Sequence, residues 1–383
     1  MAKTSLMKVN TSIAMPAHIA YSRSLKAEVT INLSHSCAQT MTLAELIQFN
    51  PTGLNDISLE YASLAGSETL RQSICDYYQL YNQGTKDLTA NQVLTFCGGQ
   101  EALSAIYRTI LVPGDEVIVF TPCYPSLVTM AEGLGCQVKQ VTLKEANNWE
   151  IDFTDVEALM SAKTKLLVLN SPHNPTGSII DLHLSDKILA LAIKYQCYLL
   201  ADEVSHASNY FNLPLSNHYL SYDKAISVGV MSKSLGLAGI RIGWLLTKNQ
   251  QWLEQLTAVK ASGSICISAI DQAAAIMAFQ QSSNIIAKNN TLIKANIEEM
   301  DAFVNEYSHL FQWHPPKAGM LALVRYLGDE GIELLSQTLA SQYGVLVLPS
   351  RLFGLPGDFF RLGLGQQNFT QGLKALRDYC NNL

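Results

Sequence analysis

Six short apolar segments recur through the middle of the chain, and longer segments with helical periodicity separate them. Continuous apolar strands that alternate with helices are typical of a parallel sheet with both faces buried. The expected strands are residues 93–96, 116–120, 165–170, 198–201, 225–229 and 244–247. This pattern predicts an α/β fold whose large domain is built on a mainly parallel sheet.

The last third of the chain has a different pattern, with helix-like sequence at 250–310 followed by short strands around one helix. The expected elements there are strands at 320–325, 345–348 and 359–363 and a helix at 332–343. Strands and helix segregated in this way predict a smaller α+β domain, joined to the large one by helix. We expect an N-terminal arm with part of the small domain at 1–45, a large domain at 46–285 and a small C-terminal domain at 286–383.

The net charge and the spacing of the cysteines limit which partners, metal sites and cellular location we expect. The net charge is −6 and no dense stripe of Lys and Arg is present, so we expect a small-molecule partner and neither nucleic acid nor an anionic membrane. No apolar run approaches the roughly 18 residues needed to cross a bilayer. The eight cysteines lie apart without zinc-ligand spacing, which predicts reduced thiols, no metal site and a cytoplasmic location.

Three polar motifs follow expected strands. Asn170–Gly177 holds two prolines that fix the backbone of a turn where sheets of this kind present their ligands. Asp202 follows the next strand, where a buried carboxylate needs a cation or water. Met231–Trp244 places Lys233 in a turn of small residues with Arg241 eight residues later. Together the motifs supply an amide, an acid, an amine and a guanidinium.

These three segments, in this order, resemble the class I/II aminotransferases of pyridoxal phosphate (PLP) fold type I. The resemblance extends from about Leu33 to Arg361, and the 28-residue spacing between Asn174 and Asp202 also matches the family. It implies an aspartate-aminotransferase-like fold, with a mainly parallel mixed sheet in the large domain and a small α+β domain. It also implies PLP as the cofactor.

The resemblance assigns roles around the cofactor ring. Lys233 would hold PLP as a Schiff base and move protons. Asp202 would keep the ring nitrogen protonated, so that the ring can accept electrons from the substrate. Asn174 would donate to the ring 3-oxygen and Tyr124 would stack on the ring, although Tyr124 also suits simple packing at a strand end.

The resemblance also implies a phosphate site. Gly99 and Gln100 follow an expected strand and begin a helix, whose free N–H groups suit an anion. Arg241 would add a charge-assisted contact. Tyr61 matches a tyrosine that reaches the phosphate of a neighbouring subunit, so the resemblance implies a homodimer with shared active sites. Arg361 would clamp the α-carboxylate of an amino acid substrate, beside Asn174.

Two positions near the expected ring and phosphate depart from the family pattern. Ser205 stands where a tyrosine usually bonds the ring 3-oxygen, so the electronic tuning of the ring should change. Val230 stands where a phosphate-binding Ser or Thr is common. Ser232 or Ser234, which flank Lys233, are expected to compensate.

The third departure is His35, which stands in a loop where aminotransferases typically have a glycine near the substrate. A histidine there suits acid or base chemistry near neutral pH, and its alternative is a partly exposed loop residue. The combination resembles the PLP- and O2-dependent L-arginine oxidases and hydroxylases. This branch implies that Lys233 removes the α-proton, electrons pass to O2 and His35 manages protons or water. The implied products are 2-oxo acids, some with a 4,5-double bond, with ammonia and hydrogen peroxide.

Other functions remain open at this stage. The main alternative is an ordinary aminotransferase that acts on a neutral or aromatic amino acid with 2-oxoglutarate, and a C–S lyase is the third candidate. A PLP-binding regulator is disfavoured because we see no extra segment of the size of a DNA-binding domain, and an inert scaffold is disfavoured because both Lys233 and Asp202 are present. The pattern does not identify an acid for a guanidinium side chain, and it leaves open whether the segment before Leu33 covers the site.

Overall fold

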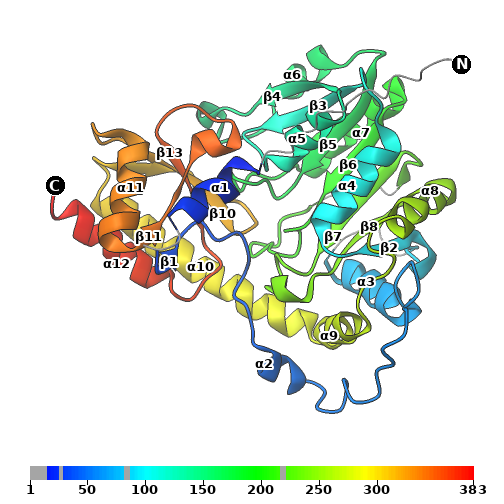
Figure 1. Ribbon diagram of the computed structural model, residues 1–383. Helices are drawn as coiled ribbons and strands as arrows, with labels where there is room; N and C mark the ends of the chain where they lie inside the picture. Colours follow the sequence, from blue (N-terminus) through cyan, green and yellow to red (C-terminus); the bar gives the residue numbers. More distant parts are fainter. Residues whose placement is uncertain (1–14, 26–28, 82–86, 216–220) are drawn as a thin grey trace, which may run out of the picture.

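The computed structural model describes residues 15–25, 29–81, 87–215 and 221–383. Its largest element is a seven-stranded sheet in the order β2-β8-β7-β6-β5-β3-β4 (Figure 1). The strands are β2 (Val93–Phe96), β3 (Glu116–Thr121), β4 (Gln137–Thr142), β5 (Thr164–Asn170), β6 (Tyr198–Asp202), β7 (Ala225–Val230) and β8 (Gly243–Leu246). β8 runs antiparallel to both of its neighbours, and the other pairs are parallel. The expected mainly parallel mixed sheet is confirmed.

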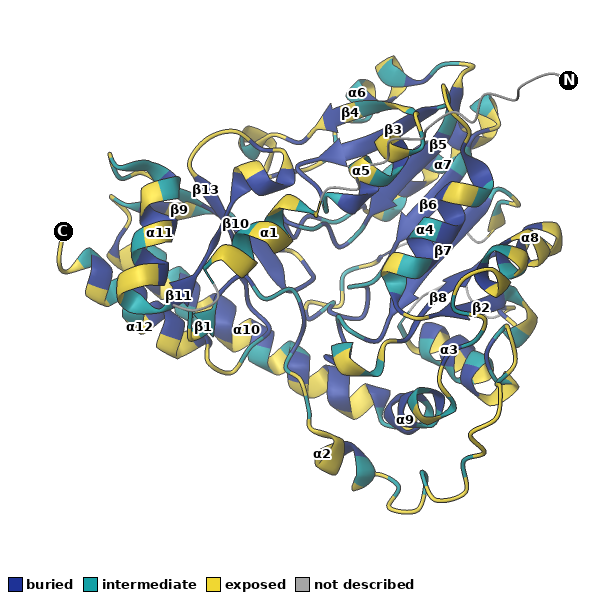
Figure 2. Cartoon of the chain, viewed as in Figure 1, coloured by how far each residue is buried: buried dark blue, intermediate teal, exposed yellow. Residues whose placement is uncertain are grey.

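Burial explains which strands could be predicted from the sequence. β2, β3, β7 and β8 are buried along their whole length, in agreement with their continuous apolar sequences, and Figure 2 shows the sheet buried beneath helices with exposed outer faces. β4 was not predicted. It is one of the two edge strands, most of its side chains are partly or fully exposed, and its sequence includes Gln and Lys.

Helices cover both faces of this sheet. They are α3 (Glu68–Tyr81), α4 (Gly99–Ile110), α5 (Ser126–Gly133), α6 (Phe153–Leu159), α7 (Leu182–Tyr195), α8 (Gln250–Ala261) and α9 (Ala269–Gln280). The helical stretch expected at 250–310 is three helices, because α9 begins at a new N-cap, Ser268, and is followed by α10 (Ser282–Glu306). α10 continues to the second sheet, and the domain boundary expected at residue 285 falls within it (Figure 1).

The end of the chain forms a four-stranded antiparallel sheet in the order β12-β13-β10-β9. Its strands are β9 (Phe311–Trp313), β10 (Leu321–Tyr326), β12 (Leu348–Pro349) and β13 (Phe359–Gly363). α11 (Gly331–Tyr343) and α12 (Phe369–Cys380) pack with it around a separate apolar core. The smaller α+β unit is therefore present, although the strand expected at 345–348 is divided between β12 and β11 (Val345–Leu346).

The beginning of the chain joins this second unit. β1 (Ile31–Asn32) pairs in parallel with β11. α1 (Ala17–Ser24) packs on the same unit and lies between the two sheets in Figure 1. α2 (Leu43–Ile47) follows on the way to the large sheet. The first and last parts of the chain are thus neighbours beside the large sheet.

Candidate active site

The expected motifs meet at one edge of the large sheet. β2 and β7 end there, and β8 begins there, since Gly243 at the start of β8 pairs with Phe96 at the end of β2 and with Val230 at the end of β7. The parallel strands β3, β5 and β6 end at the same edge. Ligands of open α/β sheets bind outside the carboxyl ends of the strands.

One corner of this edge is suited to an anion. Gly98 has a φ of +98°, and a Cβ on it would lie 2.6 Å from Nη2 of Arg241, so a glycine is required for this approach. Gly99 begins α4, whose first N–H groups are free of helical partners. Gln100 donates from Nε2 to Ser126 Oγ at 3.0 Å and accepts from the Tyr124 hydroxyl at 3.3 Å. The structure therefore brings these predicted residues together.

The two serines beside Lys233 differ in their availability. Ser234 is buried, and its Oγ accepts a hydrogen bond from Ser208 Oγ at 2.8 Å. Ser232 is only partly buried. Of the two expected replacements for a phosphate-binding residue at Val230, Ser232 is the one whose hydroxyl is left accessible.

Lys233 follows β7 and points to the loop after β1. Its Nζ donates a hydrogen bond to Ser36 Oγ at 2.8 Å. Burial lowers the pKa of Lys233, which increases its neutral, nucleophilic fraction. Ser36 was not predicted, because it lies 197 residues away and belongs to no recognisable motif.

Asp202 ends β6 and is buried. Its Oδ1 accepts a hydrogen bond from the Val204 N–H at 3.3 Å, and burial raises the pKa of its carboxyl to about 6. Asn170 fixes the adjacent turns, because it donates to the Asp202 carbonyl at 3.0 Å and accepts from the Asn174 N–H at 2.7 Å. A buried carboxylate of this kind suits a cationic partner such as a protonated pyridine nitrogen.

Arg361, on β13, faces the same edge from the small unit. Its Nη2 donates to the Ser34 carbonyl at 2.8 Å, and its Nη1 lies 3.5 Å from Asn174 Oδ1. Its guanidinium carbon lies 4.6 Å from the centre of the Phe353 ring. Its Nε is buried without a partner in the described part of the chain, and burial lowers its pKa to about 10. The site is thus suited to a carboxylate ligand.

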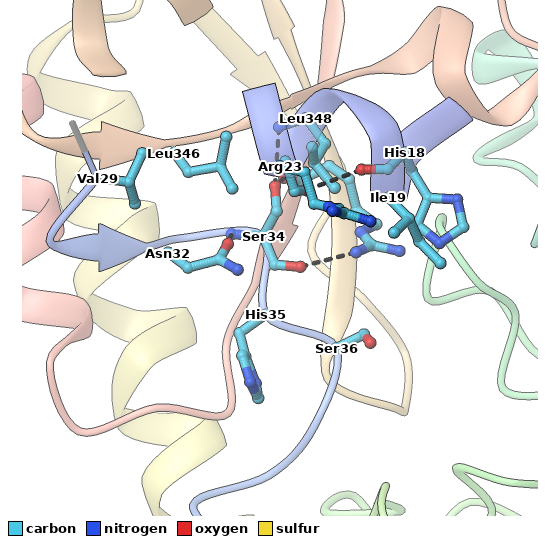
Figure 3. Close-up of a pocket in the computed structure, with 12 residues that line it drawn as sticks. His18, Ile19, Arg23, Val29, Asn32, Ser34, His35, Ser36, Leu346 and Leu348 are labelled. Carbon is cyan, nitrogen blue, oxygen red and sulfur yellow. Dashed lines mark hydrogen bonds between the residues drawn. The ribbon is translucent and has the colours of Figure 1, made fainter. Parts of the chain in front are cut away.

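A cavity of about 360 Å³ opens beside Arg361. Figure 3 shows that His18, Ile19 and Arg23 reach it from α1, while Ser34, His35 and Ser36 come from the loop after β1. His18 was not predicted, because the segment before Leu33 carries no motif. The open question of whether this segment covers the site is answered for α1, which contributes to the pocket wall.

His35 lines this cavity as well. Its Nδ1 is buried and has no hydrogen-bond partner at normal distance among the described residues; burial lowers the pKa of its imidazole, and a backbone interaction with Cys37 acts in the opposite direction. A neutral histidine with an unpaired nitrogen beside a substrate pocket is suited to proton transfer. His35 thus lies at this cavity, while its position next to a substrate and its role in catalysis stay predictions.

Two further predicted residues, Ser205 and Tyr61, do not line this cavity. Ser205 is partly buried in the turn after β6, three residues beyond Asp202. Tyr61 is 83% exposed in the segment before α3, so its expected contact with a phosphate is not made within one chain.

Among residues 15–25, 29–81, 87–215 and 221–383, no group of His, Cys, Asp or Glu has the arrangement of a metal site, and the eight cysteines are free thiols. Within the same ranges, no helix has both the length and the apolar character of a membrane span.

Comparison with known proteins agrees with this geometry. The chain matches the family of class I and II aminotransferases over residues 28–375. Capreomycidine synthase of Streptomyces vinaceus is 27% identical over 354 residues, which cover 91% of this chain and 89% of that protein. Arginine–pyruvate transaminase of Pseudomonas aeruginosa is 25% identical over 365 residues, which cover 89% and 86%.

The solved structure of aspartate aminotransferase from Thermotoga maritima has the same fold. It superposes with a TM-score of 0.85 at 23% identity and covers 98% of this chain and 99% of that one. The match to the family covers most of the chain, including the segments that carry Lys233, Asp202 and Arg361. The chain therefore belongs to the class I and II aminotransferase family, and it is a PLP-dependent enzyme with the aspartate-aminotransferase fold.

Proposed function

We propose that this enzyme holds PLP on Lys233 and acts at the α-carbon of an amino acid. The observation that carries this proposal is the convergence of an amine, a buried acid and an anion-binding guanidinium, from Lys233, Asp202 and Arg361, at one edge of the sheet. When bound, the cofactor supplies an electron sink that makes the α-hydrogen acidic.

Each residue has a task that follows from its position. Asp202 holds a proton on the cofactor's ring nitrogen, because a buried carboxylate stabilises a cation beside it. Arg361 and Asn174 hold and orient the substrate carboxylate, which fixes the α-hydrogen relative to Lys233. Lys233, whose pKa burial lowers, takes this hydrogen as a general base. Gly99, Gln100, Ser232 and Arg241 hold the phosphate, and Tyr124 packs on the ring.

We further propose that the substrate is L-arginine and that O2 accepts the electrons. The substrate, O2 and water would give a 2-oxo acid, ammonia and hydrogen peroxide. Two observations support this: His35 is one of the residues that line the pocket, and a relative of this chain is an arginine–pyruvate transaminase. Ser205, at the position of the usual tyrosine, leaves the ring oxygen with one donor fewer.

A second candidate function is transamination of a neutral or aromatic amino acid with 2-oxoglutarate. The observation that favours it is the charge of the pocket. No Asp or Glu lines it in the part of the chain that the structure describes, whereas Arg23 and Arg361 do. A guanidinium side chain there would lack an acidic partner from these residues. A C–S lyase uses the same catalytic groups and stays a third candidate.

We also propose that the enzyme is a homodimer with shared sites. Tyr61 is 83% exposed and Leu59, in the same segment, is 80% exposed. Exposed aromatic and apolar residues of this kind suit a subunit interface, where Tyr61 would reach the phosphate of the second subunit.

Oxygen consumption distinguishes these functions. The yellow holoenzyme is incubated with L-arginine in air, without a 2-oxo acid, while dissolved oxygen, ammonia and peroxide are followed; Lys233→Ala is the control. Sustained uptake with ammonia release supports the arginine oxidase. Turnover of an amino acid only after pyruvate or 2-oxoglutarate is added contradicts the oxidase and supports transamination. Release of pyruvate, ammonia and a thiol from L-cystathionine supports the lyase.

A further inference from the structure

α1 is attached to the small unit along one side. Tyr21 and Leu25 pack against an apolar cluster formed by Leu346, Leu348, Leu352 and Phe353. The Tyr21 hydroxyl also donates to Ser336 Oγ at 2.8 Å, and the guanidinium carbon of Arg351 lies 5.7 Å from the Tyr21 ring centre. These contacts hold the helix in a defined orientation.

His18, on this helix, contacts the other unit. Its ring centre lies 5.6 Å from that of Tyr124, in an edge-to-face arrangement, and 6.0 Å from that of Phe353. Phe353 also packs against the guanidinium of Arg361 at 4.6 Å. His18 therefore lies between Tyr124 and the Phe353 ring that packs on Arg361, at the pocket drawn in Figure 3.

The polar atoms around this pocket are incompletely paired. Nδ1 of His18 and Nε of Arg361 are both buried, and neither has a hydrogen-bond partner within the described residues. Buried polar atoms are normally paired, and an unpaired one at a binding site marks a place for a ligand atom. Both side chains line the same cavity.

The charges around His18 indicate the kind of ligand. Burial and the positive charges of Arg361 and Lys233 lower the pKa of His18 to about 4, so the imidazole is neutral at pH 7. A neutral imidazole keeps one N–H donor. Arg23 and Arg361 both line the cavity, and two cationic groups together with this donor are complementary to an anion and not to a cation.

We propose that His18 is a substrate-binding residue whose ring N–H donates a hydrogen bond to the α-carboxylate held by Arg361. The inference rests on the proposed function and specifies its ligand, an α-amino acid bound through its carboxylate. His18 thus adds selectivity for amino acids over amines that lack a carboxylate. The helix at the start of the chain becomes part of the binding site and not only its cover.

Binding of two probes to the PLP-loaded enzyme tests this role. One probe is 2-aminoisobutyrate, which has a carboxylate but no α-hydrogen to lose, and the other is isopropylamine, which lacks the carboxylate. The dissociation constant of each is measured from the change in visible absorption. The variants are His18→Phe, which keeps the ring contacts, His18→Asn, which keeps a donor close to the Nδ1 position, and Ser24→Ala, an exposed control on the same helix.

We expect His18→Phe to weaken 2-aminoisobutyrate binding about tenfold, the effect of losing one hydrogen bond to a charged group, and to leave isopropylamine binding unchanged. His18→Asn should recover most of the affinity, and Ser24→Ala should match the wild type. An equal loss for both probes in His18→Phe would assign His18 to packing alone and overturn the inference. Failure of the wild-type holoenzyme to bind any amino acid would instead overturn the proposed function and this inference with it.

Discussion

Two regions meet at Lys233: the carboxyl ends of the large-sheet strands, here called the cofactor edge, and the cavity beside Arg361, here called the substrate pocket. They form in different ways. At the cofactor edge, Asp202, Asn174 and Lys233 each lie at or shortly after the end of a strand, and the strand order alone brings them together. In the substrate pocket, Ser34 and Arg361 are 327 residues apart and meet only because the first segment docks on the last. Local sequence therefore specifies the first region, and long-range packing specifies the second.

The variant Lys233→Ala is the most severe test of the cofactor edge. Without the amine, we expect loss of the borohydride-reducible PLP linkage and a fall in turnover of at least about 10²–10⁴-fold, the usual contribution of a general base. Absorbance after borohydride reduction measures the linkage, and circular dichroism checks that the fold is kept. A reducible linkage of wild-type intensity in this variant would show that another lysine holds PLP.

Asp202→Asn tests the same edge through the pH dependence of the free energy of unfolding, measured in protein without bound PLP. Burial raises the folded-state pKa of Asp202 from 3.8 to about 6, so its contribution to stability is present below pH 3.8 and is lost as the pH rises through 6. Asn carries no charge at any pH. We therefore expect the variant to be more stable than the wild type above pH 6, by up to about 3 kcal/mol, with the difference vanishing near pH 4.

Urea unfolding of both proteins at pH 4, 5, 6 and 7.5 measures this difference. The comparison of wild type with variant at each pH isolates the effect of removing the Asp202 charge, including its effect on Glu203, whose pKa burial and the neighbouring Asp202 raise to about 8. A difference that does not change with pH would exclude an ionised, buried Asp202.

The substrate pocket is tested by Ser34→Ala, with a smaller expected effect. Ser34 Oγ donates to the Arg361 carbonyl and accepts from the Leu348 N–H, and the side chain is buried. Its removal leaves two buried backbone groups unpaired, so we expect the free energy of unfolding to fall by about 1–3 kcal/mol. Ser341→Ala, an exposed serine that bonds within α11, is the matched control. Equal stability of the two variants would show that Ser34 does not hold the two segments together.

The same contrast explains which strands and site residues could be predicted from the sequence and which could not. The buried strands and the motifs that follow them were recognisable, and the structure places Gly99, Gln100, Tyr124 and Arg241 together as expected. The edge strand β4 and the three-residue strand β9 were missed, because neither has a continuous apolar pattern long enough to recognise. Partners such as Ser36 and His18 were missed for another reason: their importance depends on which distant segment they meet.

The pairing of β1 with β11 also sets the order in which this protein matures during synthesis. The seven-stranded sheet is complete in sequence once Leu246 has been made. Ile31 is made before any strand of that sheet and waits for Val345, 314 positions later. At about 5–20 residues per second, that delay is roughly 15–60 s, of which the 99 residues from Leu246 to Val345 take about 5–20 s. The sheet that carries the proposed cofactor site is therefore synthesised before the segment that completes the proposed substrate pocket.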